Sequence, residues 1–249
     1  MSCSIPQEIL DLIIDHLYDE PTTLKTCCVV SKTWIQRTRK HLFVNMRFPP
    51  SGRHVGRWRR TFPDPTNSPA RHARTLYICQ PRLITSADVD TLLTFCGVVC
   101  LSVDIDFRRD QRASLVPLRG FSPVLRSLRL TFASLLDSEI FGLVHSFPIL
   151  EDLALVSFIG RKLGMGTPSA SPRLSGTLEL RLIGGIRSVV DKIFDLSNGF
   201  HFRKIAIPWF SEGDVFSTMD LVSRYSGTLE SLEITNCFSR TVSFGPCAR

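Results

Sequence analysis

The sequence has 249 residues, of which 43% are hydrophobic and 21% charged, with 15 glycines and 15 prolines. This composition suits a chain that buries a core, and it excludes a collagen-like, coiled-coil or wholly disordered protein. No stretch of ~18 uncharged apolar residues is present, so no membrane-spanning helix is expected. The first residues lack the basic and apolar stretches of a secretory signal, which predicts an intracellular protein of the cytoplasm, the nucleus or both.

The eight cysteines lie mostly within apolar stretches. They are too sparse for a secreted disulfide scaffold, and no paired C-x-x-C ligands indicate a zinc site. We therefore expect reduced, buried thiols, with no metal ion and no other cofactor. The chain has no phosphate-binding loop, nucleophile elbow or metalloprotease motif. No catalytic residue is assigned, and the chain is expected not to be an enzyme.

The net charge of +7 comes almost entirely from one segment. Residues 1–46 carry five Lys/Arg and five Asp/Glu, residues 47–74 carry seven and one, and residues 75–249 carry 18 and 17. Prolines on both sides of the arginines interrupt any periodicity. Residues 47–72 are therefore predicted to be a basic, proline-rich linker loop.

The same basic segment has an alternative interpretation as a nucleic-acid site. Arginines would contact the phosphates, and aromatic rings between them would stack on bases. The residues concerned are Arg53, Arg57, Trp58, Arg59, Arg60 and Phe62. We favour the linker, because nucleic-acid binders usually spread basic residues over a surface and the rest of this chain is nearly neutral.

Residues 1–46 have the pattern of a compact unit of three short helices. Aliphatic residues recur every four positions from Ile5 to Leu17, and Pro6 suits the first position of a helix. Thr22 and Ser31 are candidate N-caps of the second and third helices. Helices this short cannot bury their apolar stripes alone, so a partner or the rest of the chain must cover the remaining face.

The stretch from Ile5 to Phe43 resembles an F-box, as found in the F-box-like proteins of mushroom-forming fungi. The resemblance is carried by the order of an Ile-Pro pair, spaced aliphatic residues, a Val-Ser pair and a Trp. It implies that a Skp-type adaptor binds this unit and links it to a cullin scaffold. The residues assigned to adaptor contact are Ile5, Pro6, Ile9, Leu10, Ile13, Leu24, Val30 and Trp34. Some of them, especially Ile13, Val30 and Trp34, could instead serve only the core of the unit.

A short apolar pattern, two aliphatic residues separated by one other residue, recurs seven times in residues 73–249. Alternation at a period of two predicts a short strand in each copy, with its aliphatic side chains inward. Successive copies lie 25 or 27 residues apart. The copies are Leu76-x-Ile78, Leu101-x-Val103, Leu128-x-Leu130, Leu153-x-Leu155, Leu180-x-Leu182, Ile205-x-Ile207 and Leu232-x-Ile234. Helices are expected between them at Ser86–Phe95, Asp137–Phe147, Arg187–Leu196 and Asp214–Tyr225.

A strand followed by a helix or loop at this period is typical of a leucine-rich-repeat solenoid, in which stacked neighbours form one continuous core. The predicted fold class is α/β, with an N-terminal three-helix F-box (1–46), the linker (47–72) and an irregular solenoid of about seven repeats (73–249). No polar cap follows the seventh strand. We therefore expect either a chain shorter than its relatives or an exposed sheet edge.

The F-box resemblance implies a non-catalytic substrate receptor of a Skp–cullin–F-box ubiquitin ligase, which holds a protein target near the charged enzyme of the complex. The strand positions between and after the core aliphatic residues are expected to line the target-binding face. These positions are Tyr77, Ser102, Asp104, Arg129, Thr131, Arg181, Lys204 and Glu233. Two alternatives are a repeat-based scaffold without a ligase role and a nucleic-acid-associated protein that uses the arginine-rich segment.

Overall fold

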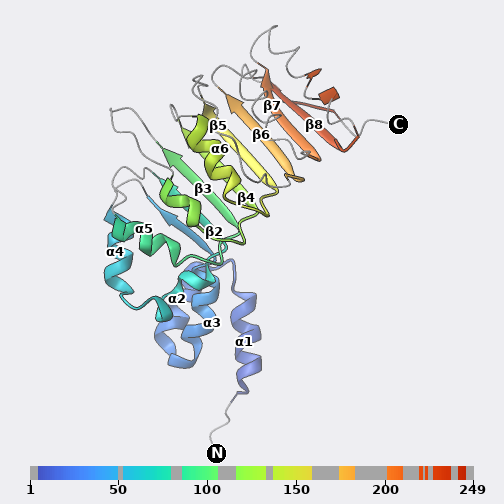
Figure 1. Ribbon diagram of the computed structural model, residues 1–249. Coiled ribbons are helices and arrows are strands. Elements are labelled where there is room, and N and C mark those ends of the chain that lie inside the picture. Colours follow the sequence, from blue (N-terminus) through green and yellow to red (C-terminus); the bar gives the residue numbers. More distant parts are fainter. Residues whose placement is uncertain are drawn as a thin grey trace, which may run out of the picture.

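The computed structural model of the chain consists of one nine-stranded sheet with a helical unit beside its first strand (Figure 1). The structure describes residues 5–49, 53–79, 86–105, 116–132, 137–158, 174–182, 201–209, 219–220, 222–223, 227–236 and 241–244. The strands are β1 (Asn45–Phe48), β2 (Thr75–Cys79), β3 (Cys100–Ile105), β4 (Ser127–Phe132), β5 (Asp152–Phe158), β6 (Thr177–Leu182), β7 (Lys204–Trp209), β8 (Ser231–Asn236) and β9 (Thr241–Phe244).

The helices that are described over their full length lie in the first part of the chain, and residues 219–220 and 222–223, within the helix expected at Asp214–Tyr225, are helical as well. The fully described helices are α1 (Gln7–His16), α2 (Pro21–Val30), α3 (Lys32–Leu42), α4 (Arg53–Thr61), α5 (Ser86–Leu93) and α6 (Asp137–His145). Three 3-10 helices accompany them, η1 (Pro65–Asn67), η2 (Pro69–His72) and η3 (Val116–Gly120). The helices expected to begin at Ser86 and Asp137 are α5 and α6. The expected helix at Arg187–Leu196, and most of the one at Asp214–Tyr225, lie outside the described residues.

The sheet follows chain order, and β1 to β8 pair in parallel. Each of the seven strands expected from the repeated pattern is present, so the α/β, repeat-like architecture is as predicted. The sheet has one more strand on each side than the seven predicted strands. At its start β1 pairs with β2, and at its end β9 pairs antiparallel with β8. Since β9 covers β8, the seventh repeat strand is not the edge of this sheet.

The core between the strands and α5 and α6 consists of two rows of aliphatic side chains, in register from strand to strand. The first row is Leu76, Leu101, Leu128, Leu153, Leu178, Ile205 and Leu232. The second contains Ile78, Val103, Leu130, Leu155 and Leu180. All but Leu232 are buried, which removes their apolar surface from water and makes one repeat depend on the next.

The sequence pattern misplaced the register of β6. The buried pair is Leu178 and Leu180, both 0% exposed, and Leu180 lies opposite Leu155. The pair equivalent to those of the other repeats is therefore Leu178 and Leu180, two residues before the predicted Leu180 and Leu182, while the inward position predicted for Leu180 is correct. Three alternating leucines make either choice equally apolar, and pairing with β5 decides between them. The pairing of β5 and β6 also contains a register shift at Val156/Phe158.

A third buried row contains large side chains that lie outside the strands. Phe95, Phe121 and Phe147 follow α5, η3 and α6 at the start of the turn into the next strand, and Leu174 and Phe202 take this place before β6 and β7. These residues were not singled out from the sequence. Their spacing of about one repeat is the signal that would have found them.

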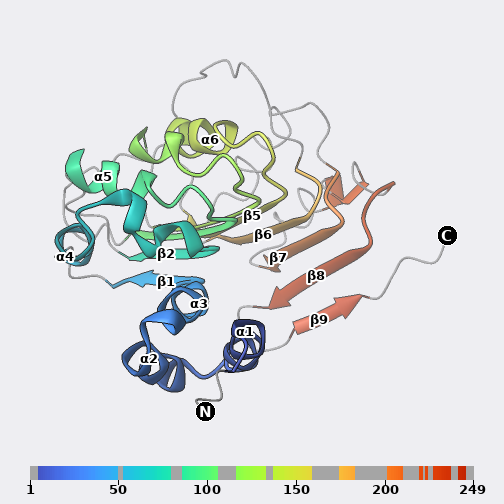
Figure 2. The same cartoon turned by 90° about the horizontal axis from the view of Figure 1, so that it is seen from below.

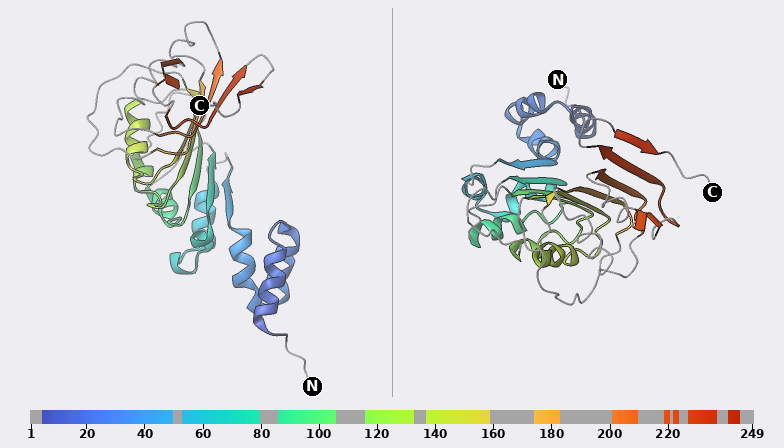
Figure 3. Two further views of the ribbon diagram at one scale, coloured as in Figure 1. Left: turned by 90° about the vertical axis from the view of Figure 1, so that its right-hand side faces the viewer. Right: turned by 90° about the horizontal axis from the view of Figure 1, so that it is seen from above.

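Figure 2 shows a curved sheet with α5 and α6 on its outer side, and Figure 3 shows the same two layers from the side. The helical unit α1–α3 lies beyond the end of the sheet from which β1 to β8 begin. The inner, concave face of the sheet is not covered by α5 or α6. The strand residues between the buried aliphatic positions point to this face, because side chains alternate along a strand.

The described part of the segment predicted as a linker loop largely forms regular elements, one of them a strand of the sheet and the others helices. Residues 45–48 form β1, and residues 53–61 form α4, whose Val55 and Trp58 are buried in the main core. Trp58 packs edge-on against Phe43, with ring centroids 5.6 Å apart, and lies 4.6 Å from Phe62. The loop prediction was wrong for these residues because prolines only flank the helix, while apolar residues recur within it at helical spacing.

Candidate functional site

The helical unit α1–α3 has a small core and a large apolar surface. Its buried side chains are Ile14, Leu24, Cys27 and Thr38. Ser31 caps α3, because its hydroxyl accepts a hydrogen bond from the Thr33 amide at 3.3 Å. This cap was expected from the sequence. The exposed apolar side chains of the unit are Ile5, Ile9, Leu12, Ile13, Tyr18, Val29 and Val30, and we call them the apolar surface of the helical unit.

The residues assigned to adaptor contact divide between this surface and the core. Ile5, Ile9 and Ile13 are about half exposed and lie four residues apart. Ile9 and Ile13 therefore share one face of α1, and Ile5 lies two residues before the helix begins. Pro6 and Val30 are also exposed, whereas Leu10 and Trp34 are partly buried. Leu24 is 1% exposed and belongs to the core of the unit, so its assignment to a binding surface is corrected.

Charged and polar contacts fix the three helices to one another. Asp15 of α1 pairs with Arg37 of α3, whose Nε donates to Asp15 Oδ1 at 2.6 Å, and His41 Nε2 lies 2.7 Å from the same oxygen. The hydrogen bonds from Arg37 hold the pKa of Asp15 well below its usual range. Cys28 Sγ and Thr38 Oγ1, 2.9 Å apart, join α2 to α3. The helices are therefore held by polar contacts on one side and leave apolar residues free on another.

The predicted target-binding residues all occupy strand positions that alternate with the buried ones. In register across the strands, one row contains Arg47, Tyr77, Ser102, Arg129, Ala154, Glu179, Ala206 and Glu233. A second row contains Cys79, Asp104, Thr131, Val156 and Arg181. Lys204 begins β7 and pairs with Thr177 and Ser231. We call these residues the polar face of the sheet.

Glu179 joins two of the predicted arginines on the polar face. Arg129 Nη1 of β4 donates to Glu179 Oε2 of β6 at 3.0 Å, across the single intervening strand β5, and Arg181 Nε lies 2.6 Å from Glu179 Oε1. The second contact is an ion pair that lacks hydrogen-bond alignment, since Oε1 has no hydrogen-bond partner. Glu179 was missed from the sequence because of the register error in β6, which hid its equivalence to Arg129.

Tyr77 and Asp104 form the second polar cluster of this face. The Tyr77 hydroxyl donates to Asp104 Oδ2 at 3.0 Å, and the guanidinium of Arg47 lies 4.7 Å from the centre of the Tyr77 ring. Burial and the carboxylate of Asp104 raise the pKa of Tyr77 to about 12. Burial likewise raises the pKa of the neighbouring Cys79 thiol. Both groups are therefore neutral near pH 7 and can take part in hydrogen bonding to a partner.

The structure also bears on metal, membrane and nucleic-acid binding. Within the described ranges, no three or more His, Cys, Asp or Glu side chains are grouped so that they could hold a metal ion. None of the helices in this part of the chain is long and apolar enough to cross a membrane.

The burial of single side chains tests two further expectations. Cys27 is buried as expected, but Cys96 is exposed. Trp58 is buried and Phe62 partly so, which removes the aromatic platform proposed for nucleic-acid bases.

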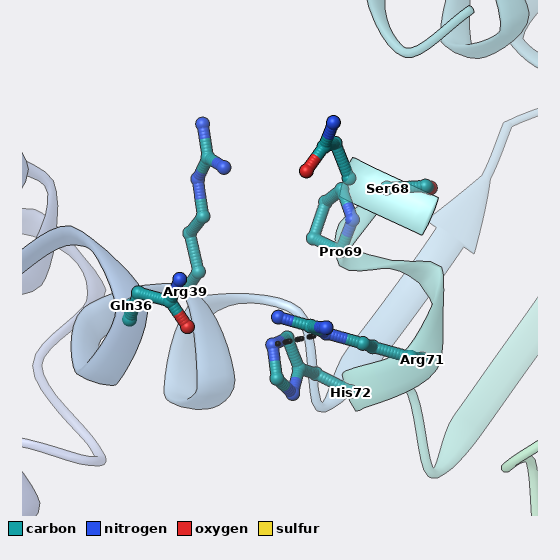
Figure 4. Close-up of a pocket in the computed structure, with 7 residues that line it drawn as sticks. Gln36, Arg39, Ser68, Pro69, Arg71 and His72 are labelled. Carbon is teal, nitrogen blue, oxygen red and sulfur yellow. Dashed lines mark hydrogen bonds between the residues drawn. The ribbon is translucent and has the colours of Figure 1, made fainter. Parts of the chain in front are cut away.

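A basic pocket lies between α3 and η2, at the junction of the helical unit and the sheet. Figure 4 shows Gln36 and Arg39 on one side, and Ser68, Pro69, Arg71 and His72 on the other; Asn67 completes the lining. Arg71 Nε donates to His72 Nε2 at 3.3 Å, a bond that a neutral imidazole accepts. Burial lowers the pKa of His72, and Arg71, Lys40, Arg39 and Arg74 lower it further.

Comparison of the chain with protein-family models, curated proteins and solved structures gave no match. The fold itself places the chain in a general class: it is an α/β repeat-like protein with an N-terminal unit of three helices.

Proposed function

We propose that this chain is a non-catalytic substrate receptor of a Skp–cullin–F-box ubiquitin ligase. In this role the helical unit is an F-box that binds a Skp-type adaptor, and the sheet is an irregular leucine-rich-repeat solenoid that binds a target protein. The observation that carries the proposal is the apolar surface of the helical unit, on which Ile5, Ile9, Ile13 and Val30 are each 47–63% exposed. The F-box resemblance assigns the same four residues to the adaptor.

Exposure of this kind has a physical consequence. Single exposed apolar residues are ordinary, but seven within a unit of about 40 residues are an interaction surface or an aggregation hazard. Covering the surface with an apolar partner releases roughly 25 cal/mol per Å² of buried apolar area. A helix-face contact with apolar residues four positions apart is one of the common modes of protein recognition.

The polar face of the sheet suits the second half of the proposal. It presents Arg129 and Arg181, both partly exposed and both paired with Glu179, beside hydrogen-bonding groups on β2 and β3. Charged and polar groups in a fixed arrangement give specificity and orientation to a protein contact. A target held there would be presented to the ligase by proximity alone.

Co-expression with a fungal Skp-type adaptor, followed by size-exclusion chromatography and calorimetry, tests the adaptor contact. The Ile9→Asp variant is expected to lose the stoichiometric complex, because it places a charge in an apolar interface. Ile149→Asp is the matched control: Ile149 is 42% exposed, close to the 47% of Ile9, but lies outside the helical unit. A folded wild-type chain that forms no complex, or equal loss in both variants, would contradict the ligase role and favour a repeat scaffold.

The polar face is tested separately with Arg129→Gln and Arg181→Gln. Neutral substitutions are preferable to charge reversal, because a glutamate at either position would face Glu179 directly. Both variants are expected to bind the adaptor as the wild type does and to recover less target in affinity purification of the adaptor complex. Unchanged recovery of every co-purified protein would remove these two arginines from the target-binding face.

A further inference from the structure

The basic pocket between α3 and η2 combines side chains that neither the strands nor the apolar surface use. Arg39 comes from α3, whereas Arg71 and His72 come from η2, and Figure 4 shows the Arg71 and His72 side chains extending toward α3. The side chain of Arg39 has no ion-pair or hydrogen-bond partner among the described residues, and within the same residues the side chain of Arg71 makes a single hydrogen bond, to His72. Two guanidinium groups are thus available from two different elements.

We propose that this pocket binds a phosphate group, either inorganic phosphate or the phosphate of a small monoester. Arginine forks match the oxygens of a phosphate through paired N–H donors, and such charge-assisted bonds are stronger than neutral ones. A compact tetrahedral dianion in this pocket would accept from Arg39 and Arg71, while Nε2 of His72 already accepts from Arg71 Nε. Gln36 and Asn67 also line the pocket, each with a side-chain amide, and one N–H of the Asn67 amide is used by Asp64.

The electrostatic surroundings favour an anion. Lys40 and Arg74 add to the positive field of Arg39 and Arg71, and each of these four cations acts on His72. The nearest acidic group in the sequence is Asp64, whose carboxylate already accepts from the Thr66 amide, the Thr66 hydroxyl and the Asn67 side chain. These bonds close the turn that begins η1. Among the described residues, neither Arg39 nor Arg71 has an ion pair with a carboxylate.

Binding would also have a structural effect. Arg39 belongs to the helical unit, and Arg71 and His72 lie immediately before β2 of the sheet. An anion shared between them would bridge the two parts of the molecule and offset the repulsion between like charges at their junction. The phosphate is thus expected to stabilise the junction without touching the apolar surface or the polar face.

The imidazole of His72 provides a local readout of binding. Inorganic phosphate, O-phosphoserine and chloride at matched ionic strength are titrated into the full chain, and the His72 resonance, assigned with His72→Gln, is followed by NMR. Both phosphates are expected to shift the resonance to saturation, and chloride is not. Tighter binding of O-phosphoserine would identify a monoester as the ligand, and tighter binding of inorganic phosphate would identify the free ion.

Two variants locate the site. Arg39→Gln and Arg71→Gln are each expected to weaken phosphate binding about tenfold or more, because each removes a charge-assisted contact. Arg57→Gln removes the same charge from an exposed position of α4 that is not part of the pocket lining, and this variant is expected to bind phosphate normally. Circular dichroism confirms that each variant is folded.

Three results would overturn the assignment. The first is a His72 resonance that shifts linearly with phosphate concentration and does not saturate. The second is an equal loss of phosphate binding in Arg57→Gln and Arg71→Gln. The third is binding of nucleic acid that Arg57→Gln and Arg71→Gln weaken to the same extent. The last result would indicate an extended basic surface instead of a pocket.

Discussion

The helical unit and the repeated sheet differ in how much of their apolar surface they bury. In the sheet, every repeat covers the next, so the rows through Leu128 and Leu155 are buried from β2 to β6. In the helical unit, Ile14 and Leu24 are buried, but Ile9 and Ile13 point to solvent. A solenoid core can be extended by adding repeats, whereas a three-helix unit of about 40 residues has too little interior for its apolar residues.

This difference separates residues that maintain the fold from residues that are available to a partner. Apolar residues in the sheet are expected to affect stability, and those on the apolar surface of the helical unit are expected to affect binding. The polar residues follow the same division. Asp15 holds helices together within the unit, while Tyr77 and Glu179 lie on the polar face of the sheet, opposite α5 and α6.

The largest expected effect is on stability in the core of the sheet. Leu155→Ala should lower the free energy of unfolding by about 2–5 kcal/mol, because Leu155 is 0% exposed and its removal leaves a cavity. Ile13→Ala, at a side chain that is 51% exposed, should lower it by about 0.5 kcal/mol or less. Urea unfolding followed by circular dichroism measures both. Equal losses would mean that Ile13 belongs to a core and is not free to bind.

A smaller effect is expected where the helical unit is held by charge. Asp15→Asn should cost about 1 kcal/mol at pH 7, because Asp15 and Arg37 are each about one-third exposed and solvent weakens their attraction. The hydrogen bonds from Arg37 depress the pKa of Asp15 in the folded state. The contribution of the Asp15 carboxylate to the free energy of unfolding is therefore fully present above pH ~4, the pKa of an aspartate in the unfolded chain, and is lost as the pH falls below that value.

Measuring unfolding of the wild type and Asp15→Asn from pH 7 to pH 2 tests this expectation. The difference between the two proteins should shrink as the pH falls below about 4. A difference that is independent of pH would show that the carboxylate charge does not stabilise the unit, and that packing alone joins α1 to α3.

An effect of comparable size is expected on the polar face. Tyr77→Phe removes the hydrogen bond to Asp104 and should cost about 1 kcal/mol at pH 7. Since burial raises the pKa of Tyr77 to about 12, its contribution is present below the unfolded pKa of about 10 and is lost as the pH rises toward 12. Thermal unfolding between pH 7 and pH 11 measures it. Tyr18→Phe, at a 68% exposed side chain, is the control and should be neutral.

The sequence predicted the repeated architecture well, because the signal for each strand is local. Alternating aliphatic residues recur at an almost constant period, and seven of the nine strands begin within a residue or two of such a pair. Helical periodicity likewise located α1 to α3, and the hydroxyl of Ser31 is in the position where a cap was expected. Such patterns depend only on the period of the backbone and on the side chains that it places on one face.

The tertiary structure decided the features for which local patterns are ambiguous. Pairing with β5 placed Leu178 and Leu180, instead of Leu180 and Leu182, opposite Leu153 and Leu155. The sequence alone left both choices open, since all three leucines fit the alternation equally well. The core of the sheet drew in Val55 and Trp58, so a basic segment between prolines became a helix. The junction of α3 and η2 brought Arg39 beside Arg71 and His72, which lie about 30 residues apart in the sequence. Each outcome depends on contacts between distant segments, and no single stretch of the sequence contains them.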